Sequence, residues 1–240
     1  MQVTAIVVAA GKGLRLGLGF NKVYAELAGK PVLAYSLEVL ERNKDISQII
    51  VVAAKSEIDA AKEVIEKYAV TKAKNIVAGG STRFRSVAAA LPYISCKSDV
   101  VLVHDGARPL LSAADLTAVI KAGSYDDGAI LATPVTDTVK QVELFDNAEK
   151  NQVRGVILHT PDRKLLWRAL TPQVFPVEIF LEAYGSLGCS VTDDASLLES
   201  CGANVKIVEG SSDNIKITNP VDLAVAELLL QKKAGDKKCE

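Results

Sequence analysis

Short apolar runs rich in β-branched residues alternate along the chain with longer stretches whose apolar positions recur at the helical period. The runs cover residues 4–10, 49–54, 75–78, 100–105 and 128–135. Strands that are apolar on both faces are typical of a sheet buried between helices. The pattern therefore predicts an α/β fold, with a mostly parallel sheet flanked by helices on both faces.

Capping signals predict where three helices begin. Ser56, Ser112 and Asn219 each stand three positions before an acidic residue, and Pro220 follows Asn219 at the first helical position. A short polar side chain can cap the exposed backbone N–H groups of a first turn, and proline is tolerated there.

The alternation of strands and helices changes between residues 136 and 160. Residues 136–143 and 152–160 resemble two strands, and the polar stretch 144–151 joins them without a helix. We expect a β-hairpin arm that leaves the main sheet. Because a lone hairpin cannot bury both of its faces, we expect the arm to pack on a second subunit; the alternative is a hairpin that lies on its own domain.

The length of the chain bears on the number of domains, and its charge on the classes of binding partner. A chain of 240 residues can form one large domain or two small ones, and since no repeat or linker is visible we expect one domain over residues 1–240. The 28 basic and 29 acidic side chains nearly cancel. The balance gives no reason to expect nucleic acid or an anionic membrane as a partner, so any anion site must be local.

The ends of the chain and the cysteines favour a cytoplasmic protein. The first residues carry no basic segment ahead of a short apolar run, and no stretch approaches the ~18 apolar residues that would span a bilayer. The four cysteines form no CxxC pair and the chain has only two histidines, so we expect reduced thiols and no zinc site.

A glycine-rich stretch at residues 11–19 follows the first predicted strand directly. It contains Gly11, Gly13 and Arg15, and Lys22 comes soon after it. Backbone N–H groups and cations at the carboxyl end of a strand are where open α/β sheets bind phosphates. A tight turn without a ligand is the alternative interpretation.

Two common nucleotide motifs are excluded here. A dinucleotide fingerprint needs a small residue at Leu16 and an acidic residue near Ala53 and Ala54. A Walker A loop needs Ser or Thr after Gly-Lys, whereas Pro31 follows Lys30.

Two further strand ends carry charged candidates. Asp105 ends the run 100–105 and is a natural Mg²⁺ ligand if it faces bound phosphates; alternatively it caps the next segment, and Arg108 pairs with a surface acid. Residues 213–218 are interpreted as a strand that places Lys216 between two isoleucines. That lysine either faces an anion or points to solvent.

Seven ordered motifs resemble one family over nearly the whole chain. They are AAGKGLRLGLGFNKV, GGSTRFRSV, VHDGARP, TPVTDTVK, LWRALTPQVF, TDDASLLE and DNIKIT. The chain resembles the 2-C-methyl-D-erythritol 4-phosphate cytidylyltransferase family. The resemblance implies a Rossmann-like domain of the nucleotide-diphospho-sugar transferase type and a homodimer formed through the arm. It also implies Mg²⁺-dependent attack of the methylerythritol phosphate on the α-phosphate of CTP, with release of pyrophosphate.

The resemblance also implies roles for individual residues. The catalytic cations would be Arg15, Lys22 and Lys216. The nucleotide would be bound by Ala9, Ala10, Gly11, Gly13, Gly80, Ser81, Ser86 and Asp105, with Asp105 also the Mg²⁺ ligand. The acceptor would be held by Arg108, Thr138, Lys140, Arg163, Thr171 and Thr192, some of them reaching across the dimer.

The chain departs from the family pattern near the nucleotide. Asn21 and Val23 flank the loop lysine where Pro and Gln are usual, so we expect a loop that is more mobile when empty. Ser81 stands where the family often has Asp, which removes one expected polar contact.

Three rival functions remain open. Ribitol 5-phosphate cytidylyltransferases share the glycine loop and the aspartate, but the segments 133–140 and 166–175 favour methylerythritol. An NAD(P)-dependent oxidoreductase is disfavoured by Leu16. A catalytically inactive nucleotide-binding subunit is disfavoured by the joint presence of four charged residues, Arg15, Lys22, Asp105 and Lys216.

Overall fold

The computed structural model describes residues 1–11, 21–123, 128–145, 153–186 and 192–236. A central seven-stranded sheet has the order β11-β7-β10-β6-β1-β4-β5. Its strands are β1 (Val3–Val8), β4 (Ile46–Ala53), β5 (Ala73–Ala78), β6 (Val100–Asp105), β7 (Ala129–Pro134), β10 (Trp167–Pro176) and β11 (Lys206–Glu209). Only β10 runs antiparallel to its neighbours among these described strands, so the sheet is mostly parallel as predicted.

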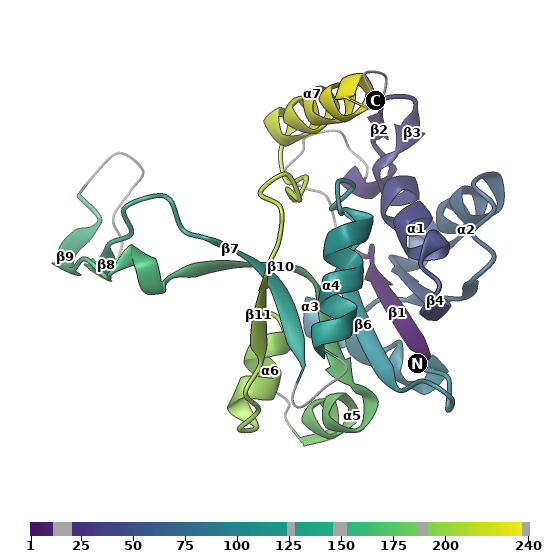
Figure 1. Ribbon diagram of the computed structural model, residues 1–240, viewed down its shortest axis with the longest axis horizontal. Helices are drawn as coiled ribbons and strands as arrows, with labels where there is room; N and C mark the ends of the chain where they lie inside the picture. The colour runs from purple at the N-terminus through teal and green to yellow at the C-terminus, as the bar shows by residue number, and fades with distance from the viewer. Residues whose placement is uncertain (12–20, 124–127, 146–152, 187–191, 237–240) are drawn as a thin grey trace.

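Helices cover both faces of the sheet and make a three-layer molecule (Figure 1). One face packs on α1 (Val32–Arg42), α2 (Ile58–Lys67) and α4 (Ala113–Gly123). The other face packs on α3 (Arg83–Ala88), α5 (Val177–Ser186) and α6 (Asp194–Ser200). Strand side chains alternate between the two cores, because successive residues of a strand point to opposite faces: Val7 enters the first core and Ile6 the second.

A third, smaller core lies beside the main sheet. Here α7 (Pro220–Asp236) packs on the small sheet β2 (Glu26–Leu27) and β3 (Lys30–Pro31). Ile217, which precedes α7, is fully buried in this core together with Leu110 from the segment after β6. The short 3-10 turns are η2 (Lys22–Tyr24), η3 (Lys55–Glu57), η4 (Leu91–Tyr93) and η5 (Arg163–Leu165).

Most of the predicted elements are confirmed. All five apolar runs are strands of the sheet, and β10 and β11 are additional strands that the pattern missed. The Oγ of Ser112 accepts a hydrogen bond from Asp115 N at 3.0 Å, and Asn219 and Asp222 bond each other reciprocally at the start of α7. The prediction for Ser56 was wrong, because η3 occupies its position and α2 begins after Glu57.

The predicted strand at residues 213–218 was also wrong. The segment is irregular, because its backbone bonds to a loop rather than to a strand: Ile217 N donates to Ala107 O at 2.9 Å. A side-chain hydrogen bond also holds this segment against β10, because Asn214 Nδ2 donates to Thr171 O at 2.9 Å.

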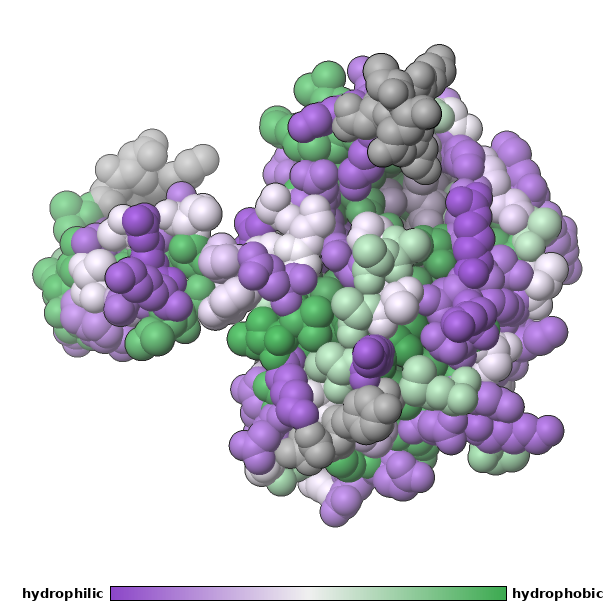
Figure 2. Space-filling view, viewed as in Figure 1, coloured by the Kyte–Doolittle hydropathy of each residue, from purple (hydrophilic) through white to green (hydrophobic). Residues whose placement is uncertain are grey.

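The predicted hairpin exists and extends away from the main body (Figure 1). It pairs β8 (Gln141–Leu144) with β9 (Gly155–His159), so its first strand is shorter than predicted. Several large apolar side chains lie exposed on it, including Leu144 and Ile157, and Figure 2 shows hydrophobic atoms on the surface of this separate lobe. Among the described residues, no helix is long and apolar enough to cross a membrane.

The close approach of α4 to β10 yields a stability prediction. A Cβ added to Gly123 would lie 2.6 Å from Val174 O, whereas one added to Gly185 in α5 would meet nothing within 4 Å. We expect Gly123→Ala to lower the free energy of unfolding by about 1–3 kcal/mol, because helix and strand must move apart. Gly185→Ala should leave it unchanged or raise it by up to about 1 kcal/mol. Urea unfolding checks both variants, and equal effects would contradict the packing described.

Candidate active site

The site lies where β1 and β6 end side by side. Val8 pairs with Asp105 in the parallel register, so the residues after both strands meet at one edge of the sheet. A cavity of about 380 Å³ opens there. It is lined by Val8, Ala9, Ala10, Gly11, Asn21, Lys22, Val23, Gly80, Ser81, Thr82, Arg83, Ser86, Asp105, Ala107 and Lys216. Gly11, the first residue of the glycine-rich stretch, therefore lies at the same edge of the sheet as Asp105, as predicted, and the rest of the stretch lies outside the described residues.

Backbone segments approach closely on the β5 side of this cavity. A Cβ on Gly79 would lie 2.4 Å from the Cβ of Ala10, so only glycine lets the two loops meet. Ser86, buried in α3, accepts a hydrogen bond from Gly80 N at 3.1 Å and donates to Thr82 O at 2.8 Å. Its hydroxyl thus shapes the glycine turn that forms the cavity wall.

The Asp105 carboxylate is surrounded by cations. Its Oδ2 lies 2.9 Å from Lys216 Nζ and 3.5 Å from Arg108 Nε, and its Oδ1 lies 3.8 Å from Arg83 Nε. Burial alone would raise the pKa of this carboxyl, but the positive charges of Lys216, Arg83 and Arg108 outweigh burial and hold the pKa well below its usual range. Asp105 is therefore an anion throughout the physiological range of pH.

A second cavity of about 280 Å³ adjoins the first and shares Arg83, Asp105 and Lys216 with it. Its other lining residues are Arg108, Ala169, Leu170, Thr171, Gln173, Thr192 and Asp193. The shared residues form a common wall between two spaces that each present cations.

Arg83 is a site residue that the sequence analysis missed. It lines both cavities, and its Nη2 lies 2.6 Å from Oδ2 of the fully buried Asp194. Tyr184 donates to the other oxygen of Asp194 at 2.6 Å. Arg83 lies within the motif GGSTRFRSV, so the resemblance contained the signal for it.

Lys216 reaches Asp105 because its irregular segment is tied down on both sides. Arg108 Nη1 donates to Asn214 O at 2.7 Å, and Ile217 is fully buried under α7. Lys216 itself stays partly exposed, with 38% of its side-chain surface accessible. The charge is thus held at the cavity wall by a backbone that is fixed from behind.

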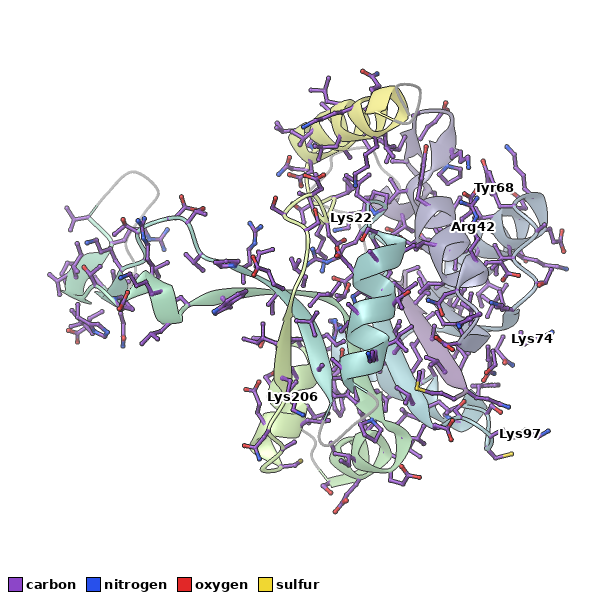
Figure 3. All side chains as sticks on the ribbon, viewed as in Figure 1. Lys22, Arg42, Tyr68, Lys74, Lys97 and Lys206 are labelled. Carbon is purple, nitrogen blue, oxygen red and sulfur yellow. The ribbon has the colours of Figure 1, made fainter. Side chains whose placement is uncertain are left out.

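The structure brings most of the candidate residues together. The first cavity contains Ala9, Ala10, Gly11, Lys22, Gly80, Ser81, Ser86, Asp105 and Lys216. The second contains Arg108, Thr171 and Thr192 beside Asp105 and Lys216. Gly13 and Arg15 lie outside the described residues. Figure 3 shows Lys22 in the central part of the molecule and Lys74 and Lys97 at its margin.

Three candidates lie on the arm or at its base and line neither cavity. Lys140 Nζ donates to Thr160 Oγ1 at 2.7 Å, and Arg163 Nη1 donates to Thr136 O at 2.9 Å. Thr138 is exposed at the base of the arm. Within one chain these residues do not meet the others.

Thr171 has its hydroxyl engaged inside the protein. The oxygen accepts from Asp105 N at 3.1 Å and lies 3.0 Å from His104 Nδ1. His104 is fully buried, and burial lowers its pKa to about 4. The ring is therefore neutral at neutral pH, and Thr171 links it to the backbone N–H of Asp105.

Asp105 could hold a metal ion only together with oxygen atoms of a bound substrate. Among the described residues, no group of three or more His, Cys, Asp or Glu could form a protein cage for a metal. Asp105 is a permanently ionised oxygen donor at the wall of both cavities. Mg²⁺ is commonly bound through one or two carboxylates together with phosphate oxygens, which matches this donor set.

Two adjoining cavities that share cations and a carboxylate at a sheet edge are typical of an α/β enzyme that brings two anionic substrates together. Comparisons with known proteins agree. Residues 3–232 match the model of the family described as 2-C-methyl-D-erythritol 4-phosphate cytidylyltransferase. The chain belongs to this family of nucleotidyltransferases, and the predicted family and enzyme class are thereby confirmed.

Individual relatives cover nearly the whole chain. The enzyme of this name from Alkaliphilus metalliredigens is 41% identical, over 100% of this chain and 97% of its own length. That from Caldanaerobacter subterraneus is 42% identical, over 97% of this chain and 100% of its own. The crystal structure of 4-diphosphocytidyl-2C-methyl-D-erythritol synthase from Anaerococcus prevotii superposes with a TM-score of 0.79 and 33% identity, covering 95% of this chain and 98% of that one. The Rossmann-like fold class is therefore confirmed as well.

The buried His104 generates a prediction about pH and stability. The unfolded state takes up a proton below about pH 6.5, whereas native His104 does so only near its pKa of about 4. Stability is therefore lost as pH falls between these values. His104→Asn keeps a side chain that can hydrogen-bond Thr171 but removes the titration. Between pH 7 and pH 5 we expect the variant to lose about 2 kcal/mol less unfolding free energy than the wild type. Equal losses in urea titrations would contradict a neutral buried His104.

Proposed function

We propose that the chain transfers CMP from CTP to 2-C-methyl-D-erythritol 4-phosphate, giving 4-diphosphocytidyl-2-C-methyl-D-erythritol and pyrophosphate. The observation that carries this proposal is the pair of adjoining cavities with Asp105, Lys216 and Arg83 as their common wall. Such an arrangement suits two phosphate-bearing substrates that must react with each other. Family membership supports the identity of both substrates.

The first cavity would bind CTP. Its wall of loop backbone at Ala9, Ala10, Gly11 and Gly80 suits the base and ribose. Lys22 at the same cavity would bind the triphosphate, and Arg15 from the glycine-rich segment would join it. Both cations would stabilise the negative charge that builds on the α-phosphate and the departing pyrophosphate.

The second cavity would bind the acceptor phosphate beside Arg108, Lys216, Thr171 and Thr192. The attacking atom is a phosphate oxygen that is already anionic near neutral pH, so no strong general base is needed. The step forms a bond between this oxygen and the α-phosphorus of CTP and breaks the bond to pyrophosphate. Lys216 would lower the repulsion between the two anions and align them.

Asp105 would act in two ways in this mechanism. It holds Lys216 and Arg108 by ion pairs at the wall between the cavities. It would also hold Mg²⁺ together with substrate phosphate oxygens, and the ion would supply further neutralisation of charge on the reacting phosphates.

The arm would complete the acceptor site of a second subunit, within a protomer whose residues 1–240 form one domain. This homodimer explains why Thr138, Lys140 and Arg163 lie apart from both cavities of their own chain. It also explains the apolar side chains exposed on the arm, since contiguous exposed apolar surface marks interaction sites. The exposed free thiols of Cys96 and Cys201 support a reducing, cytoplasmic location.

Pyrophosphate release with CTP and Mg²⁺ tests the reaction. We expect release with methylerythritol 4-phosphate and not with ribitol 5-phosphate. Lys216→Ala should lower kcat by at least ~10²-fold, the scale of a lost electrostatic stabiliser. Lys74→Ala, at an exposed position on β5, is the matched control and should keep full activity (Figure 3). Release with ribitol 5-phosphate alone would assign another acceptor, and release with neither would remove the proposal.

Sedimentation of an arm variant tests the dimer. Ile157 is 61% exposed on β9, and we expect Ile157→Asp to convert a dimer into a species of 25.5 kDa, because a charge would be buried at the subunit contact. Val221→Asp on α7, where the side chain is 69% exposed, is the control and should stay dimeric. A wild-type chain that sediments as a monomer at micromolar concentration would argue against the arm as a dimer contact.

A further inference from the structure

Asn21 is a buried polar side chain beside the nucleotide cavity that the proposed mechanism does not use. It is only 1% exposed. Its Nδ2 donates two hydrogen bonds, to Ala9 O at 2.7 Å and to Glu57 Oε2 at 2.8 Å, while its Oδ1 accepts from Val23 N at 3.3 Å. The amide therefore joins three different segments of the chain: the end of β1, η3 and η2.

The bond to Ala9 fixes the place where the chain returns to the cavity. Ala9 is held in the sheet by its own N, which donates to Val52 O at 2.8 Å. Asn21 follows residues 12–20, so its bond to Ala9 joins the two ends of the glycine-rich segment. This bond ties the start of η2 to a backbone position that the sheet already holds in place.

The bond to Glu57 fixes the orientation of the next turn. Glu57 accepts from Asn21 through its carboxylate, and its main-chain O accepts from the Tyr24 hydroxyl at 3.2 Å. Asn21 and Tyr24 stand at the two ends of η2, and Lys22 lies between them. Val23 in the same turn is buried in the main core. Two polar anchors and one apolar anchor thus fix the backbone that carries Lys22.

We propose that Asn21, held by Glu57, is a positioning residue that sets the direction in which Lys22 approaches the triphosphate. The inference rests on the proposed function, which assigns Lys22 to the triphosphate. Asn21 touches no reacting atom in this scheme. A displacement of about 1 Å in a charge that stabilises a transition state costs on the order of 10²-fold in rate, so fixing the turn has a catalytic effect.

The carboxylate of Glu57 explains why an amide is needed at position 21. An aspartate there would be isosteric but would have no N–H groups for Ala9 O and Glu57, and its charge would repel both oxygens. An alanine would leave the carbonyl of Ala9 without its side-chain partner. At position 57, by contrast, a glutamine still offers an oxygen that can accept from Asn21.

Steady-state kinetics of pyrophosphate release provide the test. We expect Asn21→Ala and Glu57→Ala each to lower kcat by about tenfold or more with the KM for the acceptor unchanged, on the scale of a misplaced stabiliser. Glu57→Gln should retain most of the activity, because the accepting oxygen remains. Lys55→Ala, an exposed position on the same turn η3, is the control and should match the wild type.

The Lys22→Ala background separates positioning from a merely structural role. If Asn21 acts through Lys22, then Asn21→Ala should cause no further loss of kcat once Lys22 is absent. The same fold-loss in both backgrounds, or near-normal kcat in Asn21→Ala beside an impaired Lys22→Ala, would overturn the inference and leave the proposed function intact. Full activity of Lys22→Ala would instead remove the assigned role of Lys22, and the inference with it.

Asn21 is buried, and its variant can fail to fold. Glu57 is only half-buried, so the comparison of Glu57→Ala with Glu57→Gln gives a second route to the same answer. Equal kcat values for these two variants would count against the inference, because the proposed bond survives in only one of them.

Discussion

The ion pairs of Asp105 are the interaction on which the rest of the site depends. A carboxylate at the end of β6 is buried only because Lys216, Arg108 and Arg83 surround it, and an unpaired charge in that position would be strongly unfavourable. Each of these cations comes from a different segment. Lys216 lies in the irregular segment before α7, Arg108 in the loop after β6, and Arg83 in α3. The carboxylate thus gathers the cations that the two cavities share. The sheet places Asp105 at the edge where the cavities open, and the ion pairs of its carboxylate hold the three cations there.

Much of the fold could be predicted because its signals are local. Five apolar runs became strands, and the polar caps at Ser112 and Asn219 marked two helix starts. Strands that pair with distant segments left weaker signals in the sequence. The strand β10 carries Pro172 and Pro176, which argue against a strand unless a neighbouring β-bulge or a strand end accommodates them, and the register of β10 does shift between Ala169 and Gln173.

In the candidate site, too, residues within local motifs could be predicted, whereas contacts between distant segments could not. Lys22, Asp105 and Lys216 could be chosen from motifs, but the strand predicted around Lys216 was wrong because its backbone partner is Ala107, in a loop about a hundred residues away. Arg83 was missed because its side chain is held at the cavities by an ion pair with the buried Asp194, which lies far from it in the sequence. For Asn21, the departure from the family pattern gave no sign of the three hydrogen bonds that its side chain makes. Contacts between segments far apart in the sequence decided each of these outcomes.

The strand β10 gives the arm a mechanical consequence. One continuous strand carries Trp167, which pairs with Pro134 where the arm begins, and Thr171, which lines the second cavity only four residues later. The base of the arm and part of the wall of the second cavity therefore belong to the same strand. In the proposed homodimer, a load on the arm would reach Thr171 through the stretch of β10 between Ala169 and Gln173, where the pairing with β7 is irregular. The contact between the proposed subunits and the width of the second cavity would then be coupled through a few residues of one strand.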